Sequence, residues 1–231
     1  MRETNPKYEE KRLRHLVASE ARALEAIGVN SNPSVLDVGA GDGRVSFRLV
    51  DELGLFPSKI VFLDINEAEL DVAQRNLLPS DSFEADFVVA NLMDGLPFSD
   101  NSFDLCLALG DVVGVAAGGA VQQGVSELLR VTAPGGTAVF SLPTMAFLLF
   151  QAIKRGQSPA EILAVKRTGV ISEWNENFGE GEFKTVPSVS QFTFGLINSG
   201  KVASVQTRRV FTDYYPFAAR IIFTAKKSID N

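Results

Sequence analysis

The chain has 231 residues, of which 45% are hydrophobic and 22% are charged, and its formal net charge is −6. These values are typical of a globular protein with a substantial core, and the acidic balance disfavours nucleic acid as a partner. The polar N-terminus is unlike a signal peptide, and no apolar window is long enough to span a bilayer. We therefore expect a soluble, cytoplasmic protein without a membrane partner, although a local basic patch remains compatible with this charge. The sequence leaves the oligomeric state open.

The residue types that most often bind metals are scarce. Cys106 is the only cysteine, which excludes an intrachain disulfide and a multi-cysteine metal site. It lies in an apolar run, which favours an inert, buried thiol. His15 is the only histidine and lies in a charged segment, residues 7–28, that is predicted to be an N-terminal helix. We expect His15 to be a solvated surface residue, and we predict no metal site.

A glycine-rich turn follows the first predicted strand. Residues 35–38 are short, apolar and partly β-branched, which is typical of a buried parallel strand. Gly39, Gly41 and Gly43 then alternate with other residues before a helical pattern begins. A loop without Cβ atoms lets the backbone approach a ligand, and the next helix points its unpaired N–H groups there. Dinucleotide sites use G-x-G-x-x-G, whereas here the third glycine comes one residue early and Arg44 takes its place.

The pattern D-x-G-x-G-x-G, which begins at Asp37, resembles motif I of the class I S-adenosylmethionine-dependent methyltransferases. The resemblance implies that Asp37 helps to hold the amino group of S-adenosylmethionine, directly or through water. It also implies that the loop backbone wraps the methionine end of this cofactor, at Gly39, Ala40, Gly41 and Gly43. The alternative is an ordinary glycine-rich turn in another α/β protein.

A second acidic residue ends the next predicted strand, residues 59–64. Asp64 lies about 20 residues beyond the glycine loop, the spacing at which adjacent parallel strands place an acid beside a ribose. A carboxylate can accept from both hydroxyls of a ribose diol. The resemblance gives Asp64 this same role and places Ile65 against the adenine. Capping the next helix is the rival role of Asp64, but Asn66 already occupies a good N-cap position, with Glu69 three residues on.

A third cofactor contact is expected near the end of the third strand, which is predicted over residues 87–90 after a polar loop at 80–86. The stretch L-P-F-x-D-x-S-F-D that follows resembles the segment before the fourth strand in many small-molecule methyltransferases. In that family an acid or amide at this strand end meets the adenine amino group. The resemblance offers Asn91 for this role, with Leu92 contributing its backbone, although Asp94 is nearby and the register stays open.

The fourth strand, residues 104–109, is predicted to end at the reacting methyl group. Ligands of open α/β sheets sit beyond the carboxyl ends of the strands, so Leu109 is expected to contact the cofactor. Asp111 follows and could orient or deprotonate an acceptor hydroxyl or amine, or equally cap the next helix. The Asn-Pro-Pro-Tyr-type motif of many methyltransferases that act on nucleic acid or protein glutamine is absent here, which disfavours that subclass.

The second half of the chain is predicted to carry a cap over the cofactor. Residues 144–187 are expected to form a largely helical insertion, with helices over 145–154 and 159–167 and an irregular stretch over 168–187. Long irregular segments in compact domains are often lids or binding loops. Several aromatic residues could line the substrate or merely anchor their segments, and the second role is favoured for each: Tyr8, Trp174, Phe178, Phe183, Tyr214 and Tyr215. The other predicted elements are helices over 44–53, 67–78, 121–131 and 188–198, turns at 112–120 and 134–136, and strands over 137–142, 202–211 and 217–225.

The expected fold is a single α/β domain over residues 1–231. The resemblance implies a Rossmann-like, seven-stranded mixed sheet in the order 3-2-1-4-5-7-6, with the last strand antiparallel and helices on both faces. The implied activity is methyl transfer from S-adenosylmethionine to a small-molecule acceptor by direct displacement. Two alternatives remain: a non-catalytic methyltransferase-like module, and an NAD-linked oxidoreductase, which the glycine spacing opposes.

Overall fold

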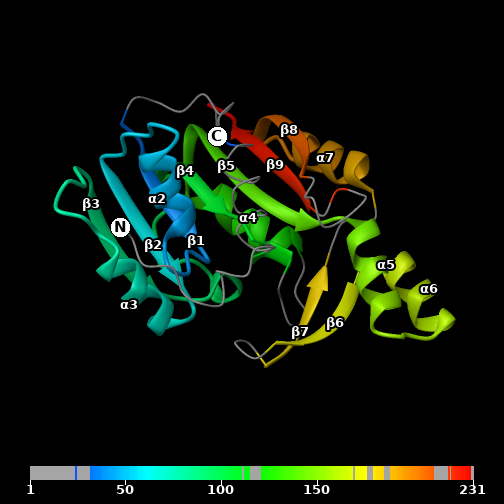
Figure 1. The fold of residues 1–231 in the computed structure, drawn as a ribbon. Coiled ribbons are helices and arrows are strands. Elements are labelled where there is room, and N and C mark those ends of the chain that lie inside the picture. Colours follow the sequence, from blue (N-terminus) through cyan, green and yellow to red (C-terminus); the bar gives the residue numbers. More distant parts are fainter. Residues whose placement is uncertain are drawn as a thin grey trace.

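A seven-stranded sheet forms the centre of the protein in a computed structural model. The structure describes Leu24, Ala218 and residues 32–110, 112–114, 121–168, 170–175, 179–184, 188–210 and 220–229. The strand order is β3-β2-β1-β4-β5-β9-β8 (Figure 1). The strands are β1 Ser34–Val38, β2 Lys59–Asp64, β3 Glu84–Val89, β4 Phe103–Ala108, β5 Thr132–Pro143, β8 Val202–Val210 and β9 Arg220–Lys227.

The predicted topology is confirmed. Strands β1 to β5 are parallel to one another, β9 is antiparallel to β5, and β8 is antiparallel to β9. Because β8 and β9 are the sixth and seventh strands of this sheet along the chain, the order is 3-2-1-4-5-7-6 with the last strand antiparallel. The five parallel strands all end at one edge, the carboxyl edge, which brings the loops after them together.

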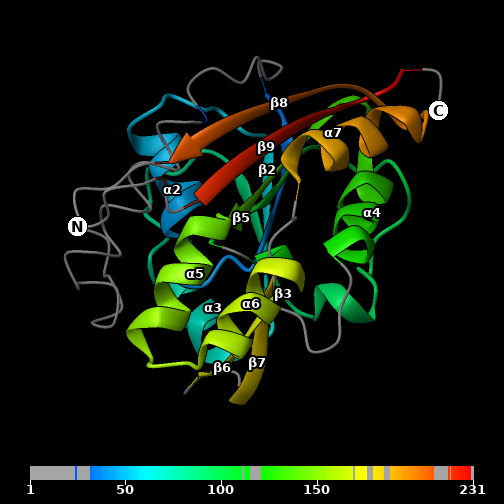
Figure 2. The ribbon, with the colours of Figure 1, turned by 90° about the vertical axis from the view of Figure 1, so that its right-hand side faces the viewer.

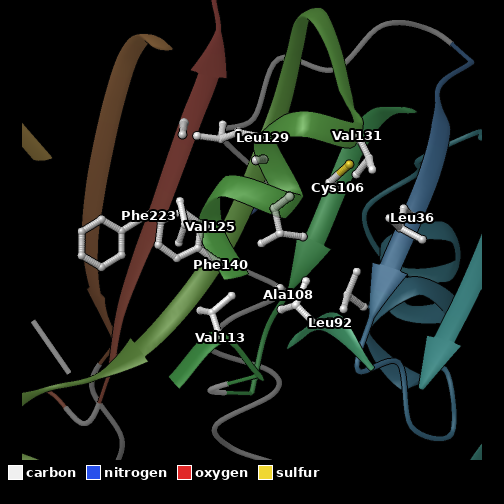
Figure 3. Close-up of a cluster of buried hydrophobic side chains, with 14 of the residues drawn as sticks. Leu36, Leu92, Cys106, Ala108, Val113, Val125, Leu129, Val131, Phe140 and Phe223 are labelled. Carbon is white, nitrogen blue, oxygen red and sulfur yellow. The ribbon is translucent and has the colours of Figure 1, made fainter. Parts of the chain in front are cut away.

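Helices cover both faces of the sheet, as Figure 2 shows with α2 on one side and α4 and α7 on the other. The two faces have separate hydrophobic cores because successive strand residues point to opposite sides. Leu36, Cys106 and Phe140 pack under α4 (Figure 3), whereas Val35 and Phe62 pack under α2 and α3. The helices are α2 Arg44–Asp51, α3 Glu67–Arg75, α4 Val121–Val131, α5 Met145–Lys154, α6 Pro159–Thr168 and α7 Val189–Asn198, with short 3₁₀ helices η2 Leu92–Asp94 and η3 Val112–Gly114.

Arg130 holds the L-P-F-x-D-x-S-F-D segment, residues 96–104, in place. Its guanidinium donates to the carbonyls of Leu96 (2.9 Å) and Phe98 (2.8 Å), and it pairs with Asp100 (2.8 Å) and Glu127 (2.9 Å). The planar fork of arginine serves several fixed acceptors at once. The segment is thereby fastened to α4 before β4 begins.

Three predicted elements were wrong in their extent or type. β3 begins at Glu84, so residues 84–86 are strand and not loop. Because β3 lies at the edge of the sheet, it contains half-exposed polar residues, which are also typical of a loop. β5 begins at Thr132 and includes the predicted turn at 134–136, with a register irregularity there. Within the stretch predicted to be irregular, β6 Val170–Asn175 and β7 Gly179–Lys184 pair as antiparallel strands.

Several predicted features lie outside the described residues. Apart from Leu24, these include the whole N-terminal helix at 7–28, with Tyr8 and His15. Asp111, Phe178, Tyr214 and Tyr215 also lie outside. In the part of the chain that is described, no helix has both the length and the apolar character needed to cross a membrane.

Candidate functional site

The glycine loop after β1 is folded onto the end of β2. Gly39, Gly41 and Gly43 all have positive φ angles, of 70°, 56° and 77°, which side-chain-bearing residues rarely adopt. The N–H groups of Gly39 and Ala40 both donate to the carbonyl of Leu63, at 2.7 and 3.0 Å. Backbone N–H groups that an anionic phosphate would need are therefore already used inside the protein.

Asp64 joins the two strand ends that the sequence predicted to form the site. One carboxylate oxygen accepts from the N–H of Gly41 (2.8 Å) and the other from the N–H of Asn66 (2.9 Å). A carboxylate has about four acceptor positions, so each oxygen can accept one further donor. Asn66, not Asp64, caps α3 by accepting from the N–H of Ala68 at 3.1 Å, which confirms the predicted capping role.

Asp42 places a carboxylate at the N-terminus of α2. It is buried and accepts from the backbone N–H of Arg44 (3.3 Å), and the Nε of Arg44 lies 3.0 Å from the same oxygen. A dinucleotide pyrophosphate sits at this end of the helix in Rossmann sites. Here the Asp42 carboxylate already accepts from the N–H of Arg44 at this position, which adds to the case that the glycine spacing makes against NAD.

Asp37 is a buried acid between the glycine loop and α2. It is 2% exposed, and the hydroxyl of Ser46 donates to it at 2.6 Å. The pKa of Asp37 is raised to about 7, mainly by burial and to a smaller extent by the negative charge of Asp64, while Ser46 and Arg44 act in the opposite direction. The carboxyl group is therefore poised to lose its proton near neutral pH, and a cation placed beside it would favour that loss.

The end of β3 brings Asn91 and Leu92 to the same edge. The N–H of Ala90 donates to the carbonyl of Asp64 at 3.1 Å, which ties the two strand ends together. The side-chain oxygen of Asn91 caps η2 by accepting from Met93 at 3.0 Å. The side chain of Leu92 is buried in the core, which leaves only its backbone for the contact that the sequence predicted. Ile65, beside Asp64, is 52% exposed, which is unusual for so apolar a side chain.

The end of β4 is held by a residue that the sequence analysis missed. The N–H of Gly110 donates to the hydroxyl of Ser141 at 3.0 Å, and Ser141 is fully buried on β5. Leu109, just before Gly110, is buried in the core under α2. The apolar surroundings of Ser141 in the sequence gave no sign of this bond, because it depends on the pairing of β4 with β5.

Val112 covers one side of Gly39. A Cβ atom at residue 39 would come within 2.3 Å of the Val112 side chain, so no residue other than glycine fits there without movement. η3, which carries Val112, also contacts β5 and β7. η3 therefore links the glycine loop to the β6–β7 strand pair.

The described residues give little support for a nucleophilic cysteine or for a metal site. Cys106 is buried as predicted, and burial raises the pKa of its thiol to about 12. A thiol with that pKa carries almost no thiolate near neutral pH. No group of three or more potential metal ligands occurs in the ranges that the structure describes.

Comparisons with known proteins agree with this geometry. A family model for a methyltransferase domain matches residues 35–136. The chain is 37% identical over 128 residues to the ubiquinone/menaquinone biosynthesis C-methyltransferase UbiE of Hahella chejuensis, a match of 52% of this chain and 48% of the relative. It is 29% identical over 187 residues to the protein of the same name in Brucella abortus (strain S19), covering 80% and 59% of the two chains. The chain thus spans only about half the length of these relatives.

Solved structures share the fold at low sequence identity. The 1,6-didemethyltoxoflavin-N1-methyltransferase of Burkholderia thailandensis, bound to 1,6-didemethyltoxoflavin and S-adenosylhomocysteine, has a TM-score of 0.62, with 15% identity and coverage of 96% of this chain and 83% of that one. An S-adenosylmethionine-dependent methyltransferase of Mesorhizobium loti has a TM-score of 0.59, with 19% identity and coverage of 90% and 95%. These matches support the resemblance to the class I S-adenosylmethionine-dependent methyltransferases that the sequence motifs indicated.

The charges at the carboxyl edge fit the cofactor of this methyltransferase family. S-adenosylmethionine carries a positive sulfonium and a positive ammonium group, and it has no pyrophosphate. Around the glycine loop the chain gathers three acids, Asp37, Asp42 and Asp64, with Arg44 as a nearby cation. A site with this excess of carboxyl groups attracts a cation and repels a phosphate.

Proposed function

We propose that this chain is an enzyme that transfers a methyl group from S-adenosylmethionine to a small-molecule acceptor. The observation that carries the proposal is the position of Asp64, which binds the N–H of Gly41 in the glycine loop and keeps acceptor capacity on both oxygens. A ribose diol presents two hydroxyl donors to such a carboxylate. The match of residues 35–136 to a methyltransferase family model supports the same assignment.

The other predicted residues receive roles around Asp64. Ile65 offers an exposed apolar side chain to the adenine, and Asn91 with the backbone of Leu92 faces its edge. Asp37 receives the cofactor ammonium, directly or through water, on the α2 side of the loop. The loop backbone at Gly39, Ala40, Gly41 and Gly43 approaches the methionine end, and Leu109 closes the site beneath the end of β4.

The bound cofactor supplies a methyl group that its positive sulfur already activates, so the chain need not provide a nucleophile. The chain's task is to align the acceptor with that methyl group and to exclude water. Ser141 holds the N–H of Gly110 and so fixes the strand end from which the acceptor is approached. Asp111, the next residue, is our candidate for orienting or deprotonating the acceptor.

The acceptor is proposed to be a small molecule. The acidic net charge disfavours nucleic acid, and the relatives in Hahella and Brucella are named for the biosynthesis of ubiquinone and menaquinone. We further propose a cytoplasmic location, because a single cysteine gives no sign of an oxidising compartment.

The direct test of the site is calorimetric binding of S-adenosylhomocysteine to three variants. Asp64→Ala is expected to weaken binding by about 1–3 kcal/mol, because a charged acceptor of two hydroxyl bonds is lost. Asp64→Asn keeps the volume but cannot accept with its amide nitrogen, so we expect an intermediate loss. The matched control is Asp86→Ala, which should bind S-adenosylhomocysteine normally. It removes an exposed carboxylate on β3 that pairs with Lys59 on β2. Unchanged affinity in Asp64→Ala refutes the assignment.

Turnover is tested separately, with labelled S-adenosylmethionine and a panel of small aromatic and amine acceptors. Transfer of the label to one of them establishes the enzyme. Cofactor binding without transfer to any acceptor, quinone precursors included, would favour the non-catalytic module instead.

A further inference from the structure

Helices α5 and α6 form a hairpin beyond the carboxyl edge of the sheet, as Figures 1 and 2 show. A short connection, residues 155–158, joins them, and they pack together through Leu148, Ala152 and Val165, all buried. The outer surface of the hairpin nevertheless carries large apolar side chains. Ile153 is 62% exposed, and Leu163 is 54% exposed. Phe150 adds a third, partly exposed ring.

The same hairpin is basic on an acidic protein. Residues 145–168 contain four cationic side chains and one carboxylate, although the whole chain has a net charge of −6. The cations are Lys154, Arg155, Lys166 and Arg167, and all four are exposed. The carboxylate, Glu161, accepts from the N–H (2.7 Å) and the hydroxyl (2.6 Å) of Ser158. It is thus engaged at the start of α6.

Apolar and cationic residues share a face on each helix. Residues three and four apart are neighbours on a helix surface. On α5 the series is Phe150, Ile153 and Lys154, and on α6 it is Leu163, Lys166 and Arg167. The cations fall at the end of each helix. Because the chain reverses between α5 and α6, cations flank the exposed apolar side chains at both ends of the hairpin.

We propose that the α5–α6 hairpin docks on an anionic membrane surface. Amphipathic helices lie in the interface with apolar side chains at the acyl boundary, while lysine and arginine reach the lipid phosphates. The basic charge of the hairpin complements anionic lipid headgroups, and it disfavours a symmetric contact with the same hairpin of a second copy, because like charges would face each other. α7 provides the contrast, since it exposes Phe194 and Ile197 but carries no charged residue. The proposal does not depend on the proposed function.

The test is sedimentation of the full chain with vesicles of phosphatidylcholine, with and without phosphatidylglycerol, at low and high salt. We expect binding to the anionic vesicles only, and weaker binding at high salt. The variant Lys166→Gln/Arg167→Gln should partition about thirtyfold more weakly, since each basic residue near the surface contributes about fivefold. Its control is Arg208→Gln/Arg209→Gln, a pair of exposed arginines on β8, which should bind like the original chain.

A second pair of variants tests the apolar part. Ile153→Ser/Leu163→Ser should bind at least tenfold more weakly, whereas Phe194→Ser/Ile197→Ser on α7 should not change binding. Circular dichroism shows whether each variant is folded. No binding to anionic vesicles, equal binding to neutral ones, or equal losses in the control variants would overturn the proposal. A concentration-dependent dimer that only Ile153→Ser/Leu163→Ser disrupts would overturn it in favour of a second copy.

Discussion

Two buried ionisable side chains lie at opposite edges of the sheet, and their partners differ greatly. At the amino edge, Nζ of Lys227 donates to the side chain of Asn101 (2.6 Å) and to the carbonyls of Leu129 (2.8 Å) and Thr132 (2.7 Å). At the carboxyl edge, the Asp37 carboxyl group accepts hydrogen bonds from only one of the described residues, Ser46. Burial lowers the pKa of Lys227 and raises the pKa of Asp37, so both charged forms are disfavoured by the same cause.

This difference distinguishes Lys227, a buried charge with a structural role, from Asp37, a buried acid for which we propose a role in ligand binding. A buried charge whose donors are all satisfied fixes the surrounding structure, and here Lys227 binds the carbonyls at the end of α4. A buried acid with few partners costs stability when it ionises. Proteins retain such costs mainly at functional sites. The glycine loop beside Asp37 is where we propose that a cationic cofactor binds.

The largest expected effect is the pH dependence of stability at Asp37. Because its pKa is raised from 3.8 to about 7, the folded protein binds more protons than the unfolded one between these values. The free energy of unfolding should therefore fall as the pH rises through this window, by about 4 kcal/mol from this residue. Asp37→Asn should lack that fall, whereas Asp86→Asn should keep it. Urea titrations at several pH values measure the difference; parallel pH curves for Asp37→Asn and the original chain would contradict it.

Gly39→Ala should destabilise the carboxyl edge by about 2–4 kcal/mol. The new Cβ combines a left-handed backbone conformation with a clash against Val112. Adding Val112→Ala should recover the part due to the clash but not the backbone strain. Denaturant unfolding of the two single variants and the double variant gives the coupling between the residues. Simple additivity would show that Val112 does not pack on Gly39.

Lys227→Met should destabilise the amino edge by about 2–3 kcal/mol, because the buried carbonyls that accept from Nζ lose their donor. Lys226→Met removes the exposed neighbouring lysine and should change the free energy of unfolding very little. Cofactor affinity should be unchanged in both variants, since this edge lies away from the proposed site. Thermal unfolding and calorimetry measure the two quantities, and equal losses of stability in the two variants would contradict the assignment.

The smallest effect is expected for Arg130→Lys, about 1–2 kcal/mol. Lysine keeps the charge but cannot reach two carbonyls and two carboxylates at once. Arg208→Lys on β8 is the matched control. Chemical denaturation is the measurement, and wild-type stability in Arg130→Lys would show that charge alone fastens the segment before β4.

Much of the fold could be predicted from the sequence because local signals agreed with the tertiary structure. The buried strand that ends in Asp64 has the predicted bounds, and Asn66 caps the helix after it. Ser188 caps α7, the helix predicted over residues 188–198. β3 was partly missed because an edge strand tolerates Glu84 and Asp86, residues that also suit a loop.

The partners of the site residues could not be read from residue types. The sequence spacing predicted that Asp64 and the glycine loop are neighbours, but the bond from the N–H of Gly41 depends on the direction of a backbone group in a left-handed turn. The contact of Val112 with Gly39 and the bond from Gly110 to Ser141 join segments far apart along the chain. Nothing in the local pattern of Val112 or Ser141 signals these contacts.

The most direct measurement is calorimetric titration of the full chain with S-adenosylhomocysteine and, separately, with NAD. We predict saturable, one-to-one binding of S-adenosylhomocysteine and no binding of NAD, because Asp42 occupies the helix N-terminus that a pyrophosphate needs. Saturable binding of NAD, with none of S-adenosylhomocysteine, would contradict this prediction.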